Sequence, residues 1–214
     1  MLYLEETLNL VPASPETLDA FSEFAAGKLV PLCHRLGCRL FVAWYNDLEW
    51  FCQVRHLLEF DSLGALQGFR RAASRDTDWG EYAAYLEEVA PVRRSRLLEP
   101  LAPVWPQVLH RAAEESLQTP QRAYTMAVLE VAPNQWDAFV AGLSQPPSGL
   151  PIVASLRPVS GSPNQVIDVW KGALRMEGYR PADDTTRQFF RNLRPRAPKE
   201  RLEPVFTLPY SELR

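Results

Sequence analysis

The chain has 214 residues, of which 46% are hydrophobic and 23% are charged, and its formal net charge is −3. This composition is typical of a globular protein with one large domain or two domains of ordinary size. The small acidic excess argues against a nucleic-acid-binding protein, because such proteins usually carry a strong basic excess. No apolar run approaches the roughly 18 residues that a spanning helix needs, so we expect no membrane segment.

The cysteines and the N-terminal residues favour a cytoplasmic location. The three cysteines, Cys33, Cys38 and Cys52, cannot all pair with one another, and none stands in a C-x-x-C motif. Reduced thiols are the simplest interpretation. The first residues, MLYLEETLNLV, contain no basic segment, so we expect no signal peptide. The spacing of cysteines and histidines matches no zinc motif, and we expect neither a metal site nor a cofactor.

The stretch 38–63 is predicted to form two strands and the start of a helix. Alternation places three apolar side chains on one face of the first strand, namely Leu40, Val42 and Trp44. The apolar face of the second strand is formed by Cys52, Val54, His56, Leu58 and Phe60. A turn at Asn46-Asp47 joins the two strands as an antiparallel hairpin. Asp61-Ser62 then supplies side-chain oxygens suited to capping the next helix.

The rest of the first half fits around this hairpin. Ser14 is the expected N-cap of the first helix and Pro15 its first residue. Pro31 should kink that helix or start a new turn, and Gly37 should end it. The order β-α-β-β-α-β is the split pattern of ferredoxin-like folds. The predicted elements beside the hairpin are a strand at Leu2–Val11 and helices at Thr17–Leu36, from Ser62 to about Arg75 and at Asp78–Val89, followed by a strand at Arg96–Pro100.

The same pattern begins again after residue 122. Leu18-Asp-Ala-Phe21 is echoed by Trp136-Asp-Ala-Phe139, and Leu97-Leu-Glu-Pro100 is echoed by Arg201-Leu-Glu-Pro204. Several echoes in the same order indicate an internal duplication. The first helix of the second half should end near Leu143. A break at Gln145–Gly149 follows this shortened helix. The other predicted elements of this half are a hairpin of Val153–Ser160 with Gln165–Leu174 and a helix at Thr185–Leu193.

We therefore predict an α+β fold made of two tandem ferredoxin-like halves. The first comprises residues 1–101, a helical linker comprises 102–122 with a helix at Val104–Leu117, and a second, shortened half comprises 123–214. Each half exposes one sheet face that must be covered, and facing the two sheets within one chain would bury both. The predicted arrangement is a fused pseudo-dimer.

Short stretches of the first half carry a family resemblance. They are Leu29-Val-Pro31, Gly37, Phe41-Val-Ala-Trp44, the run Leu57–Leu63 ending in Asp-Ser-Leu, and Asp78-Trp79. Together they resemble a NIPSNAP-family domain, a member of the dimeric α+β barrel superfamily. The resemblance covers about residues 2–101, and a weaker copy covers 123–207, in which Asp168-Val-Trp170 matches a strand where the family often has Leu-Trp. The first half has Leu58 where that tryptophan often stands, and the second lacks the Asp-Ser-Leu and Asp-Trp elements.

The resemblance implies a fold more than a function. It implies a barrel-type pseudo-dimer with a pocket between sheet and helices. Superfamily relatives include cofactor-free monooxygenases, cyclases, isomerases and haem enzymes, so a specific chemistry would rest on fold analogy alone.

His56 is the residue best suited to chemistry. It lies on the otherwise apolar face of its strand, where an imidazole can act as a general base or ligate a haem. The alternative is a histidine that is hydrogen-bonded within the core. Four aromatic side chains can line a ligand cavity or simply fill the core, and these are Trp44, Trp79, Tyr82 and Trp170.

Two functional hypotheses follow. The first is a protein that binds or transforms a small hydrophobic or aromatic molecule without a cofactor, with His56 as base and Trp44, Trp79, Tyr82 and Leu58 as pocket walls. The second is a non-catalytic interaction or scaffold protein. Its binding surface would be a basic cluster formed by Arg187, Arg191, Arg194, Arg196, Lys199 and Arg201. Under either hypothesis the chain is a candidate to form a homodimer of the pseudo-dimer. Signatures of serine hydrolases, phosphate loops and zinc proteases are absent from the sequence.

Overall fold

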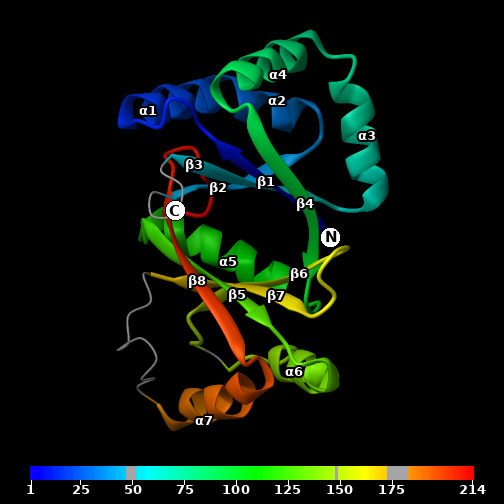
Figure 1. Ribbon diagram of the computed structural model, residues 1–214, viewed down its shortest axis with the longest axis vertical. Helices are drawn as coiled ribbons and strands as arrows, with labels where there is room; N and C mark the ends of the chain where they lie inside the picture. The colour runs from blue at the N-terminus through cyan, green and yellow to red at the C-terminus, as the bar shows by residue number, and fades with distance from the viewer. Residues whose placement is uncertain (47–51, 148, 173–182) are drawn as a thin grey trace. The chain divides into compact units, whose positions relative to one another are not determined.

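The computed structural model describes residues 1–46, 52–147, 149–172 and 183–214 (Figure 1). Asp47 of the predicted turn, Ser148 of the predicted helix break and the last residues of the predicted strand ending at Leu174 lie outside the described residues. The chain divides into two compact units: unit 1 is Met1–Leu97 with Phe206–Arg214, and unit 2 is Leu98–Val205. Helices and antiparallel strands occur in both units, which confirms the predicted α+β class.

Unit 1 has four α-helices on one face of its sheet (Figure 1). Its elements are β1 (Leu2–Asn9), α1 (Pro15–Phe24), a π-helical turn (Ala25–Leu29), α2 (Val30–Arg35), β2 (Arg39–Asn46), β3 (Gln53–Phe60), α3 (Leu63–Ala73), α4 (Thr77–Val89) and the larger part of β4 (Val92–Pro100). β3 pairs with β1 on one side and with β2 on the other, and both pairings are antiparallel.

The predicted helix boundaries are confirmed where the chemistry of single residues decides them. Ser14 caps α1 by accepting a hydrogen bond from the Thr17 N–H at 3.2 Å. Ser62 caps α3 in the same way through the Ala65 N–H, also at 3.2 Å. The backbone ahead of Pro31 widens into a π-helical turn, and proline lacks the N–H needed for a regular helical hydrogen bond. Gly37 adopts φ +79°, which glycine tolerates at a helix end.

A β-bulge in β2 contradicts the prediction that Leu40, Val42 and Trp44 share one face of the strand. Leu40 pairs with Leu58, but after a register shift Val42 pairs with Leu57 and Trp44 pairs with Arg55. Paired residues share a face of the sheet, so Leu40 faces the helices while Val42 and Trp44 face the opposite side. The simple alternation of Leu40, Val42 and Trp44 is therefore wrong, because one extra residue reverses every side chain that follows it.

The core of unit 1 lies between the sheet and the four helices. The sheet contributes alternate residues, such as Leu4, Leu8, Val54 and Leu58, and the helices contribute large side chains such as Phe21. The π-helical turn, α2, α3 and α4 add further buried residues, among them Leu29, Leu32, Leu66, Phe69, Tyr82 and Leu86. Burial of apolar surface of this kind is the main favourable term in folding.

Unit 2 also combines an antiparallel sheet with helices. Its elements are the end of β4, α5 (Trp105–Gln118), β5 (Ala123–Glu130), α6 (Trp136–Leu143), β6 (Ile152–Pro158), β7 (Gln165–Lys171), α7 (Asp184–Leu193) and most of β8 (Lys199–Thr207), with short 3₁₀ turns at Pro133–Gln135 and Arg194–Arg196. α5 packs against β6, while side chains of α6 and α7 share a core with the sheet. α6 ends at Leu143, as predicted.

The strands follow one another in the order β4-β1-β3-β2 in unit 1 and β8-β5-β7-β6 in unit 2. Within unit 2, β7 pairs with β5 and β6, as β3 pairs with β1 and β2 in unit 1. β6 has its own register shift between Ile152 and Ala154. The division into units differs from the predicted boundaries, because the linker helix α5 belongs to unit 2 and Phe206–Arg214 belongs to unit 1.

Candidate functional site

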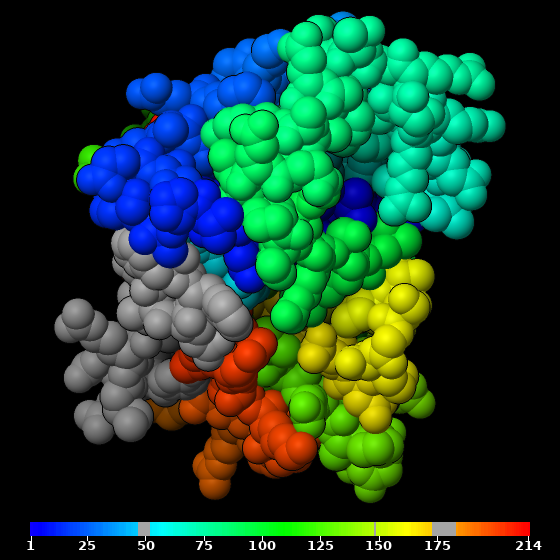
Figure 2. Space-filling view, turned by 45° about the horizontal axis from the view of Figure 1, so that its top comes forward, coloured from blue at the N-terminus to red at the C-terminus, as the bar shows by residue number. Residues whose placement is uncertain are grey.

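A cavity of about 260 Å³ opens in unit 1 among β1, α4 and β4. Its volume is slightly below the roughly 300–1,000 Å³ typical of small-molecule sites. In Figure 2, α4 and β4 (both green) lie next to each other on the face toward the viewer. The cavity is lined by Glu6, Leu8, Trp79, Tyr82, Ala83, Leu86, Arg93, Arg94 and Ser95.

Glu6 reaches this cavity because of its place in β1. It pairs in register with His56 of β3, so both residues are on the face that the helices cover. Leu4 and Leu8 stand two residues to either side and belong to the core. Sequence reasoning missed Glu6, although a signal was present: a carboxylate interrupts the run of leucines at positions 2, 4, 8 and 10. A charged residue on an apolar strand face carries a large desolvation cost unless it is paired or hydrogen-bonded, so such a residue is a candidate for a functional role.

α4 supplies the opposite wall. Trp79, Tyr82, Ala83 and Leu86 follow one another at spacings of three, one and three residues, which places them on one side of a helix. The N-cap of the helix is Asp76, whose Oδ1 accepts a hydrogen bond from the Trp79 N–H at 2.9 Å. The Trp79 ring packs edge-on against Phe69 and Tyr82, with centroid separations of 5.2 and 5.4 Å. The apolar wall is thus held in place by the cap and by aromatic packing.

Two polar groups at the cavity wall have no hydrogen-bond partner in the described part of the chain. One is the half-buried carboxyl of Glu6, and the other is the hydroxyl of Tyr82, whose side chain is 1% exposed. Burial raises the pKa of Glu6, and the nearby guanidinium groups of Arg93 and Arg70 act in the opposite direction. Burial also raises the pKa of Tyr82, to which the charge of Glu6 adds. The wall therefore offers a carboxyl that is easily protonated and an adjacent neutral phenol.

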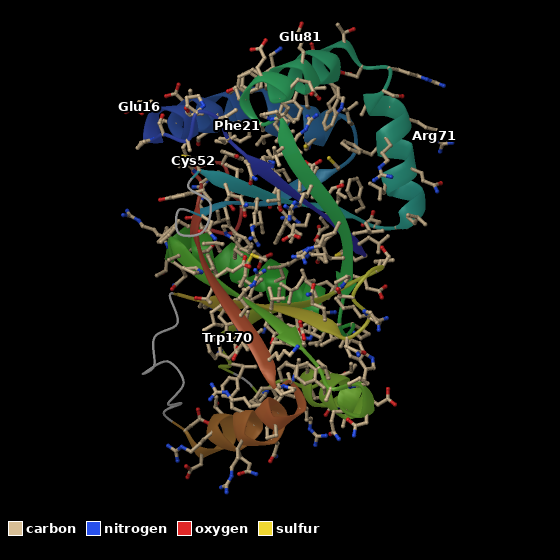
Figure 3. The ribbon with its side chains drawn as sticks, viewed as in Figure 1. Glu16, Phe21, Cys52, Arg71, Glu81 and Trp170 are labelled. Atoms are coloured by element: carbon tan, nitrogen blue, oxygen red, sulfur yellow. The ribbon has the colours of Figure 1, made fainter. Side chains whose placement is uncertain are left out.

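His56 lies deeper in unit 1 and does not line this cavity. Its side chain is 0% exposed, and its Nε2 shares a 2.8 Å hydrogen bond with the hydroxyl of Tyr210. Phe21, labelled in Figure 3, stacks on the imidazole at a centroid distance of 6.0 Å. Burial lowers the pKa of His56 to about 3, so the ring is neutral at physiological pH and is a weak base.

The other predicted site residues are divided between two faces of the sheet. Trp79 and Tyr82 line the cavity. Leu58 is on the helix-facing side and is buried in the core. Trp44 is on the opposite face, because of the bulge in β2, so the expectation that it borders one cavity with His56 is wrong. The roles of His56, Leu58 and these aromatic residues in binding or catalysis stay predictions.

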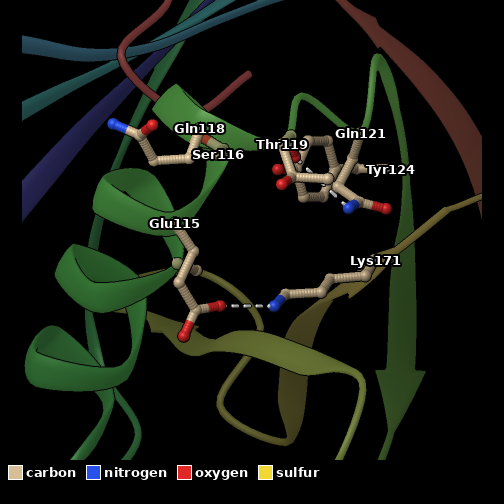
Figure 4. Close-up of a pocket in the computed structure, with 8 residues that line it drawn as sticks. Glu115, Ser116, Gln118, Thr119, Gln121, Tyr124 and Lys171 are labelled. Atoms are coloured by element: carbon tan, nitrogen blue, oxygen red, sulfur yellow. Dashed lines mark hydrogen bonds and ion pairs between the residues drawn. The ribbon is translucent and has the colours of Figure 1, made fainter.

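Unit 2 contains a second cavity, of about 390 Å³, near the C-terminal end of α5 (Figure 4). Most of the residues that line it have polar side chains, and Glu115 and Lys171 form an ion pair there with 2.8 Å between Oε2 and Nζ. Ser116 donates to the carbonyl of Ala113 at 2.8 Å. Because these polar groups already bind partners within the protein, this cavity is a weaker candidate than the one in unit 1.

The predicted basic surface of unit 2 is largely paired within the chain. Arg187 binds Asp184, Arg201 binds Glu203 at 2.5 Å, and Lys199 binds Glu130 at 2.9 Å. Further contacts join Arg196 to Gln135 and the backbone of Asn192, and Arg194 to the ring of Phe190. Intramolecular pairs of this kind leave fewer charges for a partner.

Comparisons with known proteins support the fold. No family model and no curated protein matches the sequence. Among solved structures, a candidate monooxygenase from Lactobacillus acidophilus has a TM-score of 0.62 at 10% identity, covering 95% of this chain and 92% of its own. A candidate monooxygenase from Fusobacterium nucleatum has a TM-score of 0.60 at 8% identity, covering 97% and 92%. At such low identities the likeness shows the fold alone.

Solved structures similar to part of the chain include an uncharacterised NIPSNAP domain protein from Burkholderia xenovorans. Its TM-score is 0.41 at 16% identity, and the match covers 47% of this chain and 94% of that protein. A likeness of that strength carries no argument about activity. Separately, no helix in the described residues is long and apolar enough to cross a membrane.

Proposed function

We propose that unit 1 binds a small apolar or aromatic molecule in the cavity among β1, α4 and β4, and that Glu6 exchanges a proton with it without help from a cofactor. One observation carries the proposal: the carboxyl of Glu6 has no hydrogen-bond or ion-pair partner among the described residues and borders a cavity walled by Trp79, Tyr82 and Leu86. Ligand sites typically combine an apolar lining with a few polar groups of this kind.

The chemistry follows from the surroundings of Glu6. Removal from water favours the neutral form and raises the pKa of the carboxyl, which brings its titration closer to neutral pH. A carboxyl tuned in that direction can accept a proton from an acidic position of a bound molecule and return it elsewhere. The adjacent Tyr82, neutral because its pKa is raised, is suited to stabilising polar groups of the ligand rather than to removing a proton.

We further propose that the chain is NIPSNAP-like and consists of two ferredoxin-like copies fused as a pseudo-dimer, the second degenerate. The strand order supports this, because β4-β1-β3-β2 and β8-β5-β7-β6 repeat the same sequence of first, third and second strands. The register shifts support it as well, since each copy has one at the same strand, between Leu40 and Val42 and between Ile152 and Ala154.

The binding proposal is tested by filling the cavity. Ala83 lines the cavity, whereas its neighbour Ala84 is exposed and does not. We expect Ala83→Phe to weaken binding of a neutral two-ring aromatic probe, 2-naphthamide, by roughly tenfold or more, because the new ring occupies the ligand volume. Ala84→Phe should leave the affinity unchanged. Calorimetric titration gives both affinities, and Ala83→Leu serves as a smaller filling change if the phenylalanine variant does not fold.

The proton-transfer part is tested with Glu6→Gln. The substitution keeps the shape of the side chain but cannot take up or release a proton. We expect the affinity of the natural protein for 2-naphthamide to change with pH as Glu6 titrates, above the ordinary range for a glutamate. The variant should show no such step. Identical pH profiles for the two proteins would remove Glu6 from the proposal, and loss of the step in His56→Gln alone would return the role to His56.

A further inference from the structure

We propose that the ligand of the unit 1 cavity carries an anionic group, such as a carboxylate, which binds Arg94 at the cavity mouth while the apolar part of the ligand lies against α4. This inference rests on the proposed function and adds the chemical class of the molecule. The evidence for the anionic group is the set of charged side chains that line the cavity, and whether each of them already has an ion-pair partner.

The cavity is lined by two guanidinium groups and one carboxyl group. Arg93 forms an ion pair with Glu87 of α4, so its charge is already matched. Arg94 is exposed, and it makes no hydrogen bond or ion pair with any residue in the described ranges 1–46, 52–147, 149–172 and 183–214. An arginine presents a rigid fork of N–H donors that fits a carboxylate or phosphate oxygen pair. The unmatched charge at the cavity mouth therefore favours an anion.

The part of the cavity lining away from Arg94 suits the apolar part of a ligand. Trp79, Leu86 and Leu8 present ring and aliphatic surface, and Trp79 is fixed by its edge-on contact with Phe69. The volume of about 260 Å³ is suited to a molecule of one or two rings. A cationic ligand would be repelled by the unmatched charge of Arg94, so an aromatic acid is the better match to this combination of charge and shape.

The position of Glu6 on β1 agrees with this orientation. β1 and β4 are neighbouring strands, so the carboxyl and Arg94 belong to adjacent strands of one sheet. A ligand anion is attracted to Arg94 and repelled by an ionised Glu6, which directs the charged group toward β4. An uncharged, proton-bearing part of the same molecule can then approach Glu6. Binding of the anion at Arg94 would thus set the orientation that the proposed proton exchange needs.

The test compares two probes of nearly equal shape, the anion 2-naphthoate and the neutral 2-naphthamide, by calorimetric titration near neutral pH. We expect the natural protein to bind 2-naphthoate roughly five- to tenfold more tightly, as befits one charge-assisted contact in a partly exposed site. Arg94→Gln should reduce the affinity for 2-naphthoate to that for 2-naphthamide and leave the amide unaffected. Added salt should diminish the preference for the anion.

The matched control is Arg71→Gln. Arg71 extends outward from α3 (Figure 3), is exposed and does not line the cavity, so it changes the net charge of the protein equally. Equal affinities of the natural protein for the two probes, or equal losses in Arg94→Gln and Arg71→Gln, would overturn the anion inference and leave the binding proposal standing. Failure of both probes to bind the natural protein would instead overturn the proposed function and the inference with it.

Discussion

Ionisation of Asp168 in unit 2 should lower the stability of the protein as the pH rises, which is opposite to the effect of most carboxylates in folded proteins. Asp168 lies in the middle of β7, paired with Ala127 and Ser155, and is 2% exposed. Its Oδ1 and the Ser155 hydroxyl oxygen have no hydrogen-bond partner in the described part of the chain. Burial raises the pKa of Asp168 from 3.8 to about 7, the proximity of the Ser155 hydroxyl opposes this, and the charge of Glu200 adds to it.

The magnitude follows from the two pKa values. A carboxyl whose pKa is higher in the folded state binds its proton more tightly there, so ionisation at rising pH favours unfolding. The resulting loss of unfolding free energy begins near pH 3.8, the pKa of the carboxyl in the unfolded chain, and grows until the pH passes the folded pKa of about 7. In total it amounts to about 4 kcal/mol. Between about pH 5 and about pH 8 the change is about 2.5 kcal/mol.

Asp168→Asn removes the ionisable group, and with it this pH-dependent loss of stability, and keeps the shape of the side chain. We expect the difference in unfolding free energy between variant and natural protein, measured by urea unfolding, to move in favour of the variant by about 2.5 kcal/mol from about pH 5 to about pH 8. Asp137→Asn, at an exposed aspartate of α6 in the same unit, is the matched control. Parallel pH profiles for Asp168→Asn and the natural protein would refute the argument from burial.

Two further predictions concern unit 1. Tyr210→Phe removes the hydroxyl bound to His56, and because Nδ1 of that ring already lacks a partner in the described residues, we expect a loss of about 1–3 kcal/mol in urea unfolding. A variant as stable as the natural protein would show that water replaces the bond. Ser62→Ala should cost about 1 kcal/mol by removing the cap of α3, and Ser62→Asp should restore most of it. Equal stability of Ser62→Ala and Ser62→Asp would contradict the capping role.

Helix caps and helix ends could be predicted from the sequence because single residues determine them. Ser14 and Ser62 cap helices since a hydroxyl next to a free N–H is enough, and Gly37 ends a helix since only glycine takes a positive φ without cost. The division of β3 into an apolar and a polar face likewise follows from a period of two, and His56 does face the helices.

Only part of the candidate site could be predicted from the sequence. Trp79 and Tyr82 could be recognised as cavity walls from their helical spacing, whereas Glu6 could not be recognised as its polar group. An isolated glutamate in a strand is common, and its meaning depends on which strands and helices surround it. The residues that line the cavity with it come mostly from α4 and β4, which are about 70 to 90 residues away along the chain.

The sequence by itself determined the α+β class, the caps and turns of the helices, and the apolar faces that must be buried, because these depend on interactions between residues close together in the chain. Tertiary structure alone decided which side chains share a face and a cavity. One extra residue in β2 moved Trp44 to the far side of the sheet from His56. The pairing of β4 with β1 placed Arg94 beside the cavity that Glu6 borders. Such contacts join distant segments, and their register is set by the packing of the whole sheet rather than by any local pattern.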